Sequence, residues 1–212
     1  VQYSLDRVQG RPVGLSKEDA KNSTIMDHAD VRRMLMTIKA YTDAMRYMLY
    51  DNQMMLDLSY YADDDLKDFG TERCGLLTPI TKSWISDLSV ELTSIAIQVY
   101  GGMGYVEETG IAQYFRDARI APIYAGTNGI QALDLVFRKI PFDNGKVVDK
   151  LFVDFKTTAE KLSEIKDLEY LGDLLNIHTD NLNKVTKKIN LNLLNGDLQL
   201  SLIHISEPTR LL

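Results

Sequence analysis

The sequence of 212 residues holds a single cysteine, Cys74, so no disulfide can form within the chain. One thiolate also excludes zinc sites that are built from several cysteines. The three histidines are scattered at positions 28, 178 and 204, and we expect neither a metal site nor a catalytic cluster from them. Apolar runs of about 20 residues, the length that crosses a bilayer, are missing as well.

Long runs of lysine and arginine are also missing, and the formal net charge is −6. Such a chain is not built to neutralise phosphates, so we expect no nucleic-acid partner. In contrast, 45% of the residues are hydrophobic and 25% are charged. This balance is typical of a folded chain of one or two domains with a real core.

Sustained alternation of apolar and polar residues, the sign of a half-buried strand, does not occur. Apolar residues instead recur at three- and four-residue spacing, which predicts helices at 31–62, 76–100, 111–119, 128–139, 146–162 and 168–194. We therefore expect an all-α fold, an antiparallel helical bundle with an added carboxy-terminal helical pair.

Two local features set the expected start of the second helix. Pro79 suits a first helical turn, where its missing N–H is harmless. The acidic residues 63–65, with Asp68, stand just before Gly70, where the helical pattern stops. They lack the spaced ligands and closing glutamate of a calcium loop, so we interpret them as a solvated connector rather than a cation site.

Changes of character along the chain predict three parts. Residues 1–140 form a helical bundle domain, residues 141–199 a helical extension, and residues 200–212 a non-native tail. The string LSLIHISEPTR at 200–210 resembles a translated sequencing adapter, and a natural polar tail is the alternative. Because the chain begins with Val1, we also expect it to be a piece of a longer protein.

Three segments carry chemistry: LDRVQGRPVG near the start, IQVYGGMGYVEETGIAQYFRDARI in the middle, and PIYAGTNGIQALDLVFRK after it. In the middle segment, Gly101, Gly102 and Gly104 let the backbone turn sharply and approach a ligand closely. By itself this pattern is equally typical of a helix that ends at glycine. The pattern also lacks the strand that precedes a Rossmann fingerprint, and it has no glycine at the third position of the G-x-G-x-x-G spacing.

In order and spacing, the three segments together resemble the acyl-CoA dehydrogenases over residues 1–140, and they are most similar to the branch with an extra helical extension. The resemblance implies a bound FAD and oxidation of an acyl-CoA thioester to the 2,3-enoyl-CoA. It implies an acceptor like the electron-transfer flavoprotein and a homo-oligomer, either a dimer or a tetramer. It also implies a cytoplasmic location, or the mitochondrial matrix in a eukaryote.

The resemblance places the flavin dinucleotide against two turns. Gln98, Gly101 and Gly102 are expected near its pyrophosphate. Arg7 is expected to reach a phosphate, often across a subunit interface, because a guanidinium can hold two phosphate oxygens at once, and Gln9 adds a hydrogen bond. By residue type alone, Arg7 would be a solvated arginine at a helix end.

The second turn is the corner around Gly126. The resemblance implies that Gly126, Thr127, Asn128 and Gly129 contact the flavin, and that Tyr124 and Gly126 contact the substrate. Thr127 alone could equally cap the following helix. In the same region, we expect Arg116 and Asp117 to form a structural pair that fixes the loop.

Alanine occupies the position of the catalytic base. Many relatives carry a glutamate in the sequence Y-E-G-T, and this chain has Ala125 there, which cannot accept a proton. Three explanations stay open: a base on an upstream helix, a true loss that leaves a binding or oligomerisation module, or a sequencing error. Glu107 and Glu108 are not taken as substitutes, since they follow the glycine turn and are expected to face solvent or start a helix. The isolated chain is expected to be inactive and to bind no FAD stably.

Overall fold

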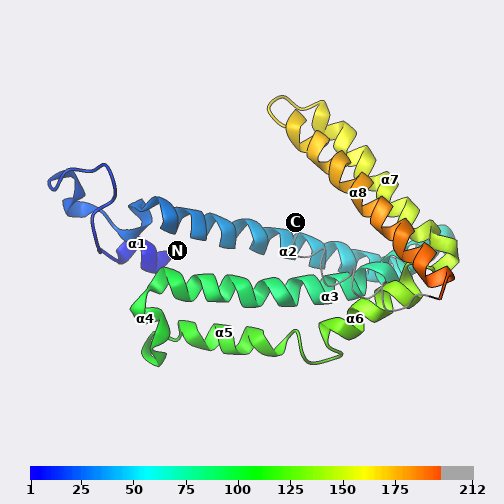
Figure 1. Cartoon of the computed structure of the whole chain (residues 1–212), viewed down its shortest axis with the longest axis horizontal. Helices are drawn as coiled ribbons and strands as arrows, with labels where there is room; N and C mark the ends of the chain where they lie inside the picture. The colour runs from blue at the N-terminus through cyan, green and yellow to red at the C-terminus, as the bar shows by residue number, and fades with distance from the viewer. Residues whose placement is uncertain (197–212) are drawn as a thin grey trace. The chain divides into compact units, whose positions relative to one another are not determined.

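The computed structural model describes residues 1–196, and this part of the chain forms helices and turns without a strand, which confirms the all-α prediction. The helices are shown in Figure 1. In chain order they are α1 (Gln2–Asp6), η1 (Asp19–Asn22), η2 (Ile25–Asp27), α2 (Ala29–Tyr61), α3 (Asp64–Tyr100), α4 (Gly102–Tyr105), η3 (Glu107–Thr109), α5 (Ile111–Ile120), α6 (Asn128–Asp134), the π-helical η4 (Leu135–Lys139), η5 (Phe142–Gly145), α7 (Lys146–Ser163) and α8 (Glu169–Leu194).

Two compact units divide the chain. The first contains residues 1–51 and 81–127, and the second contains residues 52–80 and the described residues from 128 onward. The predicted domain boundary after residue 140 stays a prediction. The predicted tail at 200–212, with His204, lies outside the described residues.

In the first unit, the early part of α2 runs antiparallel to the late part of α3. The core of this unit contains buried Met34 from α2, Val99 from α3 and Ile25 from the short helix η2. Further along, the ring of Tyr41 meets Trp84 edge-on, with ring centroids 6.4 Å apart. These contacts explain the helical spacing of the apolar residues, because one face of each helix is covered by the other.

The amino terminus packs at the carboxy-terminal end of α3. Tyr3 stacks on Tyr100 with ring centroids 3.9 Å apart and planes 9° from parallel, and its hydroxyl donates to the Tyr100 carbonyl at 3.3 Å. Ser4, on the same short helix, is fully buried. The segment that carries Arg7 is therefore fixed to the end of α3 where the glycine turn begins.

The second long helix begins much earlier than predicted. We expected its start between residues 76 and 79, whereas α3 begins at Asp64 and carries Pro79 in its interior. Leu76 and Leu77 are buried, and the side chain of Pro79 is fully buried. The prediction was wrong because burial of this segment outweighs the lost hydrogen bond and steric cost of an internal proline.

The acidic residues 63–65, which we predicted to lie in a connector between helices, are only partly in one. Asp63 precedes α3, but Asp64 and Asp65 form its first turn, where the partial positive charge of the helix start favours carboxylates. Gly70 does not break the helix either. A β-carbon there would lie 2.7 Å from the Met55 carbonyl oxygen of α2, so this glycine lets the two helices approach closely.

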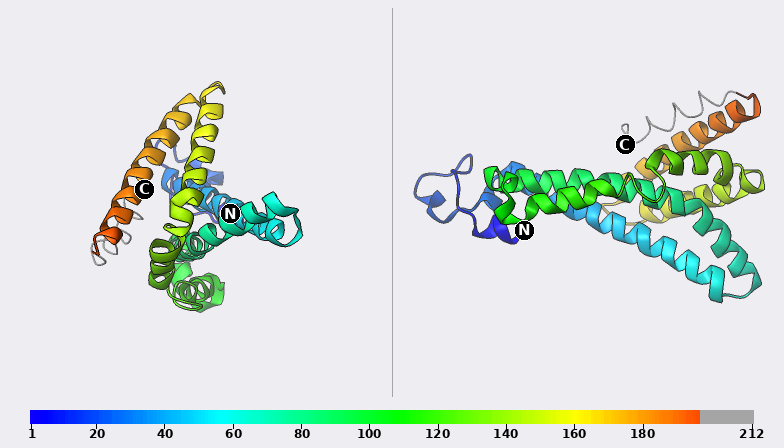
Figure 2. Two further views of the ribbon diagram at one scale, coloured as in Figure 1. Left: turned by 90° about the vertical axis from the view of Figure 1, so that its right-hand side faces the viewer. Right: turned by 90° about the horizontal axis from the view of Figure 1, so that it is seen from below.

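In the second unit, α7 and α8 form an antiparallel hairpin, which Figures 1 and 2 show side by side from three directions. Their bounds lie within one residue of the predicted helices. The hairpin closes tightly at Gly172, where an added β-carbon would lie 2.6 Å from the Ala159 carbonyl oxygen. The core of this unit consists of Leu76, Val136, Ile140, Val147, Val148, Phe152 and Ile189.

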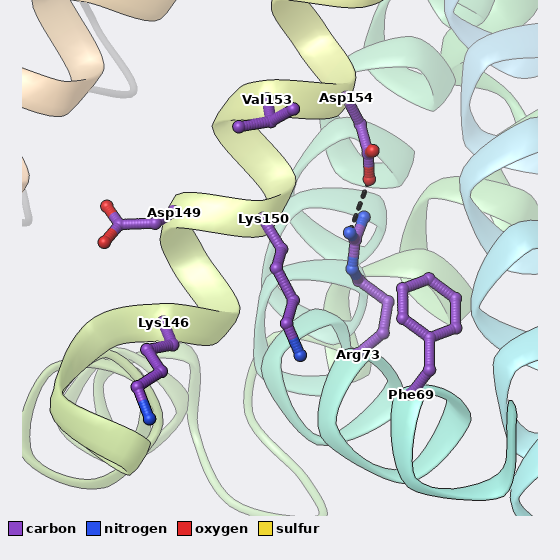
Figure 3. Close-up of a pocket in the computed structure, with 7 residues that line it drawn as sticks. All are labelled: Phe69, Arg73, Lys146, Asp149, Lys150, Val153 and Asp154. Carbon is purple, nitrogen blue, oxygen red and sulfur yellow. Dashed lines mark hydrogen bonds and ion pairs between the residues drawn. The ribbon is translucent and has the colours of Figure 1, made fainter. Parts of the chain in front are cut away.

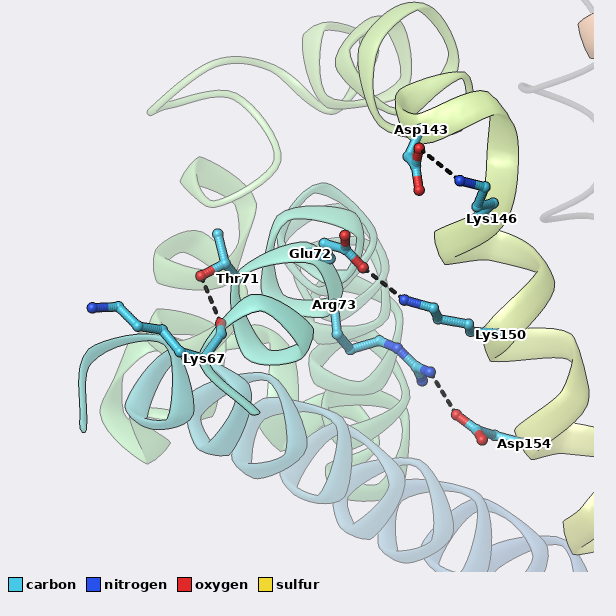
Figure 4. A network of polar contacts seen from close by, with 8 residues as sticks. All are labelled: Lys67, Thr71, Glu72, Arg73, Asp143, Lys146, Lys150 and Asp154. Atoms are coloured by element: carbon cyan, nitrogen blue, oxygen red, sulfur yellow. Dashed lines mark hydrogen bonds and ion pairs between the residues drawn. The ribbon is translucent and has the colours of Figure 1, made fainter. Parts of the chain in front are cut away.

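Ion pairs join α3 to α7 within the second unit. Arg73 is buried with only 6% of its surface exposed, and it donates to the Asp154 carboxylate at 2.5 Å while lying 5.2 Å from the Phe69 ring centre. Lys150 pairs with Glu72 at 3.0 Å (Figure 4). A groove beside these pairs is lined by Phe69, Arg73, Lys146, Asp149, Lys150, Val153 and Asp154 (Figure 3).

None of the helices within residues 1–196 has both the length and the apolar character that spanning a membrane requires. The same residues contain no group of three or more histidine, cysteine, aspartate or glutamate side chains placed to hold a metal ion.

Candidate functional site

The turn after α3 presents exposed backbone to solvent. The Gly101 N–H donates to the Gln98 carbonyl at 3.0 Å, and Gly101 has φ = 61° and ψ = −142°, a conformation that a residue with a β-carbon rarely adopts. Gln98, Gly101 and Gly102 are exposed, and nothing lies within 4 Å of an added β-carbon at either glycine. The outer surface of this turn is therefore open, and its predicted contact with a pyrophosphate stays a prediction.

Gly104, in the same motif, has a different function. It is buried, and a β-carbon there would lie 2.3 Å from the Ile97 carbonyl oxygen and 3.0 Å from Cβ of Tyr100. This glycine lets the short helix α4 fold back onto the end of α3. It therefore shapes the turn, whereas Gly101 and Gly102 leave its outer surface open.

Arg7 and Gln9 lie on an exposed segment that follows α1 at the same end of the first unit, and we call residues 7–9 the strap. Two guanidinium nitrogens of Arg7 donate to the Gln9 side-chain oxygen at 3.3 and 3.4 Å. The Gln9 carbonyl lies 3.0 Å from Nε2 of His28, and the Arg7 carbonyl accepts from the Ile25 N–H at 2.8 Å. Since Tyr3 stacks on Tyr100, the structure brings this strap and the glycine turn to one end of α3.

The second corner connects α5 to α6. Ala125 and Gly126 have φ = 53° and 80°, so two consecutive residues adopt the left-handed conformation. Tyr124, Ala125, Gly126 and Thr127 are all exposed. The Gly126 carbonyl accepts a hydrogen bond of 2.8 Å from Nζ of Lys82 on α3.

Asn128 and Gly129, the last two predicted flavin contacts, are the first residues of α6. They belong to the second unit, whereas Gly126 and Thr127 belong to the first. Their predicted contacts with a cofactor stay predictions.

The two corners lie at different positions along α3. The chain leaves α3 at Tyr100, and α5 brings it back until Gly126 meets Lys82 (Figure 1). Lys82 precedes Gln98 by 16 residues, which is about 24 Å at the rise of an α-helix. The same chemical group of a ligand therefore cannot contact both corners of one chain.

The segment between the corners is the helix α5, and its polar contacts differ from the expected Arg116–Asp117 pair. Arg116 donates to the Gln113 side-chain oxygen at 2.7 Å, and the Gln113 nitrogen donates to Asp117 at 2.6 Å, so the amide bridges the two. Arg116 also lies 3.8 Å from Glu107. Because Gln113 and Arg116 stand three residues apart on one helix face, they meet where adjacent Arg116 and Asp117 do not.

Glu107 has 85% of its side chain exposed and lies in the 3₁₀ turn η3, as expected of a residue that is not a buried base. The sequence interpretation missed Lys82, since a lysine in an amphipathic helix carries no signal of a partner 44 residues away. The groove of Figure 3 holds none of the predicted site residues. Its three cations, Arg73, Lys146 and Lys150, are each paired with a carboxylate.

Comparison with known proteins agrees with the motifs. The family model for the carboxy-terminal domain of acyl-CoA dehydrogenases matches residues 12–139, which is more than half of the chain. The chain belongs to the acyl-CoA dehydrogenase family. Within that family it is similar to a 3-methylmercaptopropionyl-CoA dehydrogenase of Ruegeria pomeroyi, with 38% identity over 164 residues. The match covers 77% of this chain and 28% of the relative.

Two further acyl-CoA dehydrogenases extend the comparison. A butyryl-CoA dehydrogenase of Syntrophomonas wolfei is 32% identical over 178 residues, which cover 80% of this chain and 28% of the relative. The crystal structure of Caenorhabditis elegans ACDH-11 in complex with C11-CoA matches with a TM-score of 0.70 and 25% identity, over 96% of this chain and 32% of that one. The likeness thus includes most of the helical extension, and the chain spans less than a third of each relative.

Proposed function

We propose that this chain is the carboxy-terminal helical part of a flavin-dependent acyl-CoA dehydrogenase that oxidises an acyl-CoA thioester to the 2,3-enoyl-CoA. The observation that carries the proposal is the exposed corner at residues 124–127, found in a chain of this family and held by Lys82. Relatives that are named for 3-methylmercaptopropionyl-CoA and butyryl-CoA support a thioester of coenzyme A as the substrate class.

The residues present fit FAD. Exposed Gln98 offers an amide, and the open backbone at Gly101 and Gly102 can approach phosphate oxygens without steric conflict. Arg7 adds a charged fork at the same end of α3. When bound, FAD would accept the hydride that leaves the carbon two bonds from the thioester carbonyl.

Because the two corners are about 24 Å apart along α3, we propose that each contacts a different part of a cofactor. The glycine turn with Arg7 holds the pyrophosphate, and the Gly126–Thr127 corner lies near the ring and the thioester. In a homo-oligomer, the two corners that meet one cofactor would come from different subunits. Exposed Met36, Tyr47 and Tyr50 on α2 supply apolar surface for such an assembly.

The alanine at position 125 decides whether the corner at residues 124–127 can supply the catalytic base. Removal of the proton beside the carbonyl requires a base, and positioned general bases contribute about 10²–10⁴-fold in rate. A methyl group accepts no proton, so residue 125 cannot be the base. In the full-length protein, a carboxylate on an upstream helix would have to supply this function.

A second function follows from the same residue. If no upstream carboxylate replaces the missing one, the protein is a catalytically inactive module that binds flavin and acyl-CoA or supports oligomerisation. As an enzyme, it would pass electrons to an acceptor such as an electron-transfer flavoprotein. We propose a cytoplasmic location, or the mitochondrial matrix in a eukaryotic host.

Anaerobic flavin bleaching by acyl-CoA tests the two functions in the full-length protein. The unaltered protein is compared with Ala125→Glu, which restores a carboxylate, and with Ala125→Gln, which has the same size but is no base. Exposure of Ala125 leaves room for both side chains. We expect the unaltered protein to bind flavin and to bleach, with no further gain from glutamate.

The other outcomes separate the alternatives. Flavin binding without bleaching, followed by bleaching in Ala125→Glu but not in Ala125→Gln, would support the inactive module. A full-length protein that retains no flavin and shows no bleaching in any form would refute the enzyme and the flavin-binding module, and would favour a module that only supports oligomerisation.

A further inference from the structure

We propose that Lys82 is a positioning residue that holds the Gly126–Thr127 peptide in the orientation that flavin binding requires. The inference rests on the proposed function, since it gives a task to a residue outside the family motifs. It concerns the first unit alone, because Lys82 and residues 124–127 both belong to it.

The contact connects a rigid helix to a strained corner. Lys82 lies near the middle of α3, half-buried, and its ammonium donates to the Gly126 carbonyl at 2.8 Å. Hydrogen bonds from a charged donor are shorter and about twice as strong as neutral ones.

The corner requires such a contact because its backbone is not locally favoured. Ala125 has φ = 53°, a conformation that a residue with a β-carbon adopts at a cost of about 1–3 kcal/mol and keeps only where its surroundings hold it. The corner is exposed, so packing contributes little to holding it. The bond from Lys82 is a restraint that ties the corner to a long helix.

Peptide planarity then determines where the corner directs its donor. In a trans peptide the C=O and the following N–H point in opposite directions. The Gly126 carbonyl points to Lys82 on α3, so the Thr127 N–H points away from α3. Lys82 therefore sets the outward direction of this backbone donor, and a rotated peptide would present a carbonyl oxygen instead.

The test uses the full-length protein and three variants. Lys82→Met removes the ammonium but keeps an unbranched side chain that is only one atom shorter, and Lys82→Arg restores a charged donor. Lys67→Met is the matched control, because Lys67 lies on the same helix, is exposed, and its ammonium points away from the other side chains drawn in Figure 4. Hydrogen exchange of the peptide covering residues 121–130 and the dissociation constant for FAD are measured for each.

For Lys82→Met we expect exchange at the corner to become about tenfold faster and FAD binding about tenfold weaker. Lys82→Arg should recover most of both, and Lys67→Met should stay within about twofold of the unaltered protein. Faster exchange at unchanged FAD affinity would overturn the positioning role while leaving the proposed function intact. Exchange in Lys82→Met equal to that in Lys67→Met would overturn the restraint itself. Failure of the unaltered protein to bind FAD would instead refute the proposed function and the inference together.

Discussion

Replacement of Gly104 by alanine tests which glycines of the turn are structural. The added β-carbon would lie 2.3 Å from the Ile97 carbonyl oxygen and 3.0 Å from Cβ of Tyr100. The nearest of these atoms belongs to the backbone of α3, so no flexible side chain can move aside. Either α4 must move away from α3 or the last turn of α3 must unwind.

The size of the effect follows from this geometry. An ordinary carbon–oxygen contact is at least 3.4 Å, so the helices must separate locally by about 1 Å. Forcing extra atoms into a tightly packed position typically costs about 1–3 kcal/mol. For a chain of about 200 residues, each kcal/mol lowers Tm by about 2–4 °C, which predicts a decrease of about 2–12 °C for Gly104→Ala.

Gly102→Ala is the matched control, because nothing lies within 4 Å of its added β-carbon. Thermal unfolding followed by circular dichroism should show a Tm within about 1–2 °C of the unaltered chain, as for most exposed substitutions. FAD affinity of the full-length protein should instead fall for Gly102→Ala, because the new methyl group occupies the space that the pyrophosphate would enter. A Gly104→Ala protein with an unchanged Tm would refute the close approach of α4 to α3.

Three further substitutions examine the ion pairs and the apolar surface. Asp154→Asn should lower the free energy of unfolding by about 1–2 kcal/mol, since it leaves the buried Arg73 guanidinium without a carboxylate, whereas half-exposed Asp154 itself is screened by water. Arg73→Met should lower the free energy of unfolding, measured by urea denaturation, by less than Asp154→Asn does, because it also removes a buried Nε that has no hydrogen-bond partner. A larger decrease for Arg73→Met than for Asp154→Asn would contradict this account. On α2, Tyr47→Glu places a charge on a side chain that is 75% exposed in the monomer, and it should dissociate an oligomer in sedimentation velocity while leaving Tm unchanged. An oligomer of unaltered stability would show that this face is not the interface.

Local pattern was sufficient for most of the helices. The spacing of apolar residues predicted α5, α7 and α8 to within a residue at each end, because each helix has an apolar face and a polar face. The motif glycines were likewise identified from their type and order, since a sharp turn requires a residue without a β-carbon.

The start of α3 was not predictable in this way. Pro79 and Gly70 are each signals that end a helix in isolation, yet both lie inside α3. Burial of Pro79 and the close approach of α2 at Gly70 arise from residues distant in sequence, and these tertiary contacts outweigh the local preferences.

By itself the sequence determined the helical class, the resemblance to a family and the absence of a carboxylate at residue 125, because these depend on residue type, order and local spacing. Tertiary structure alone decided that Gly104 packs while Gly101 and Gly102 stay open, that Lys82 reaches Gly126, and that the two corners lie about 24 Å apart along α3. These facts depend on which helices meet and at what point along their lengths, and that information is carried by contacts between residues far apart in the chain.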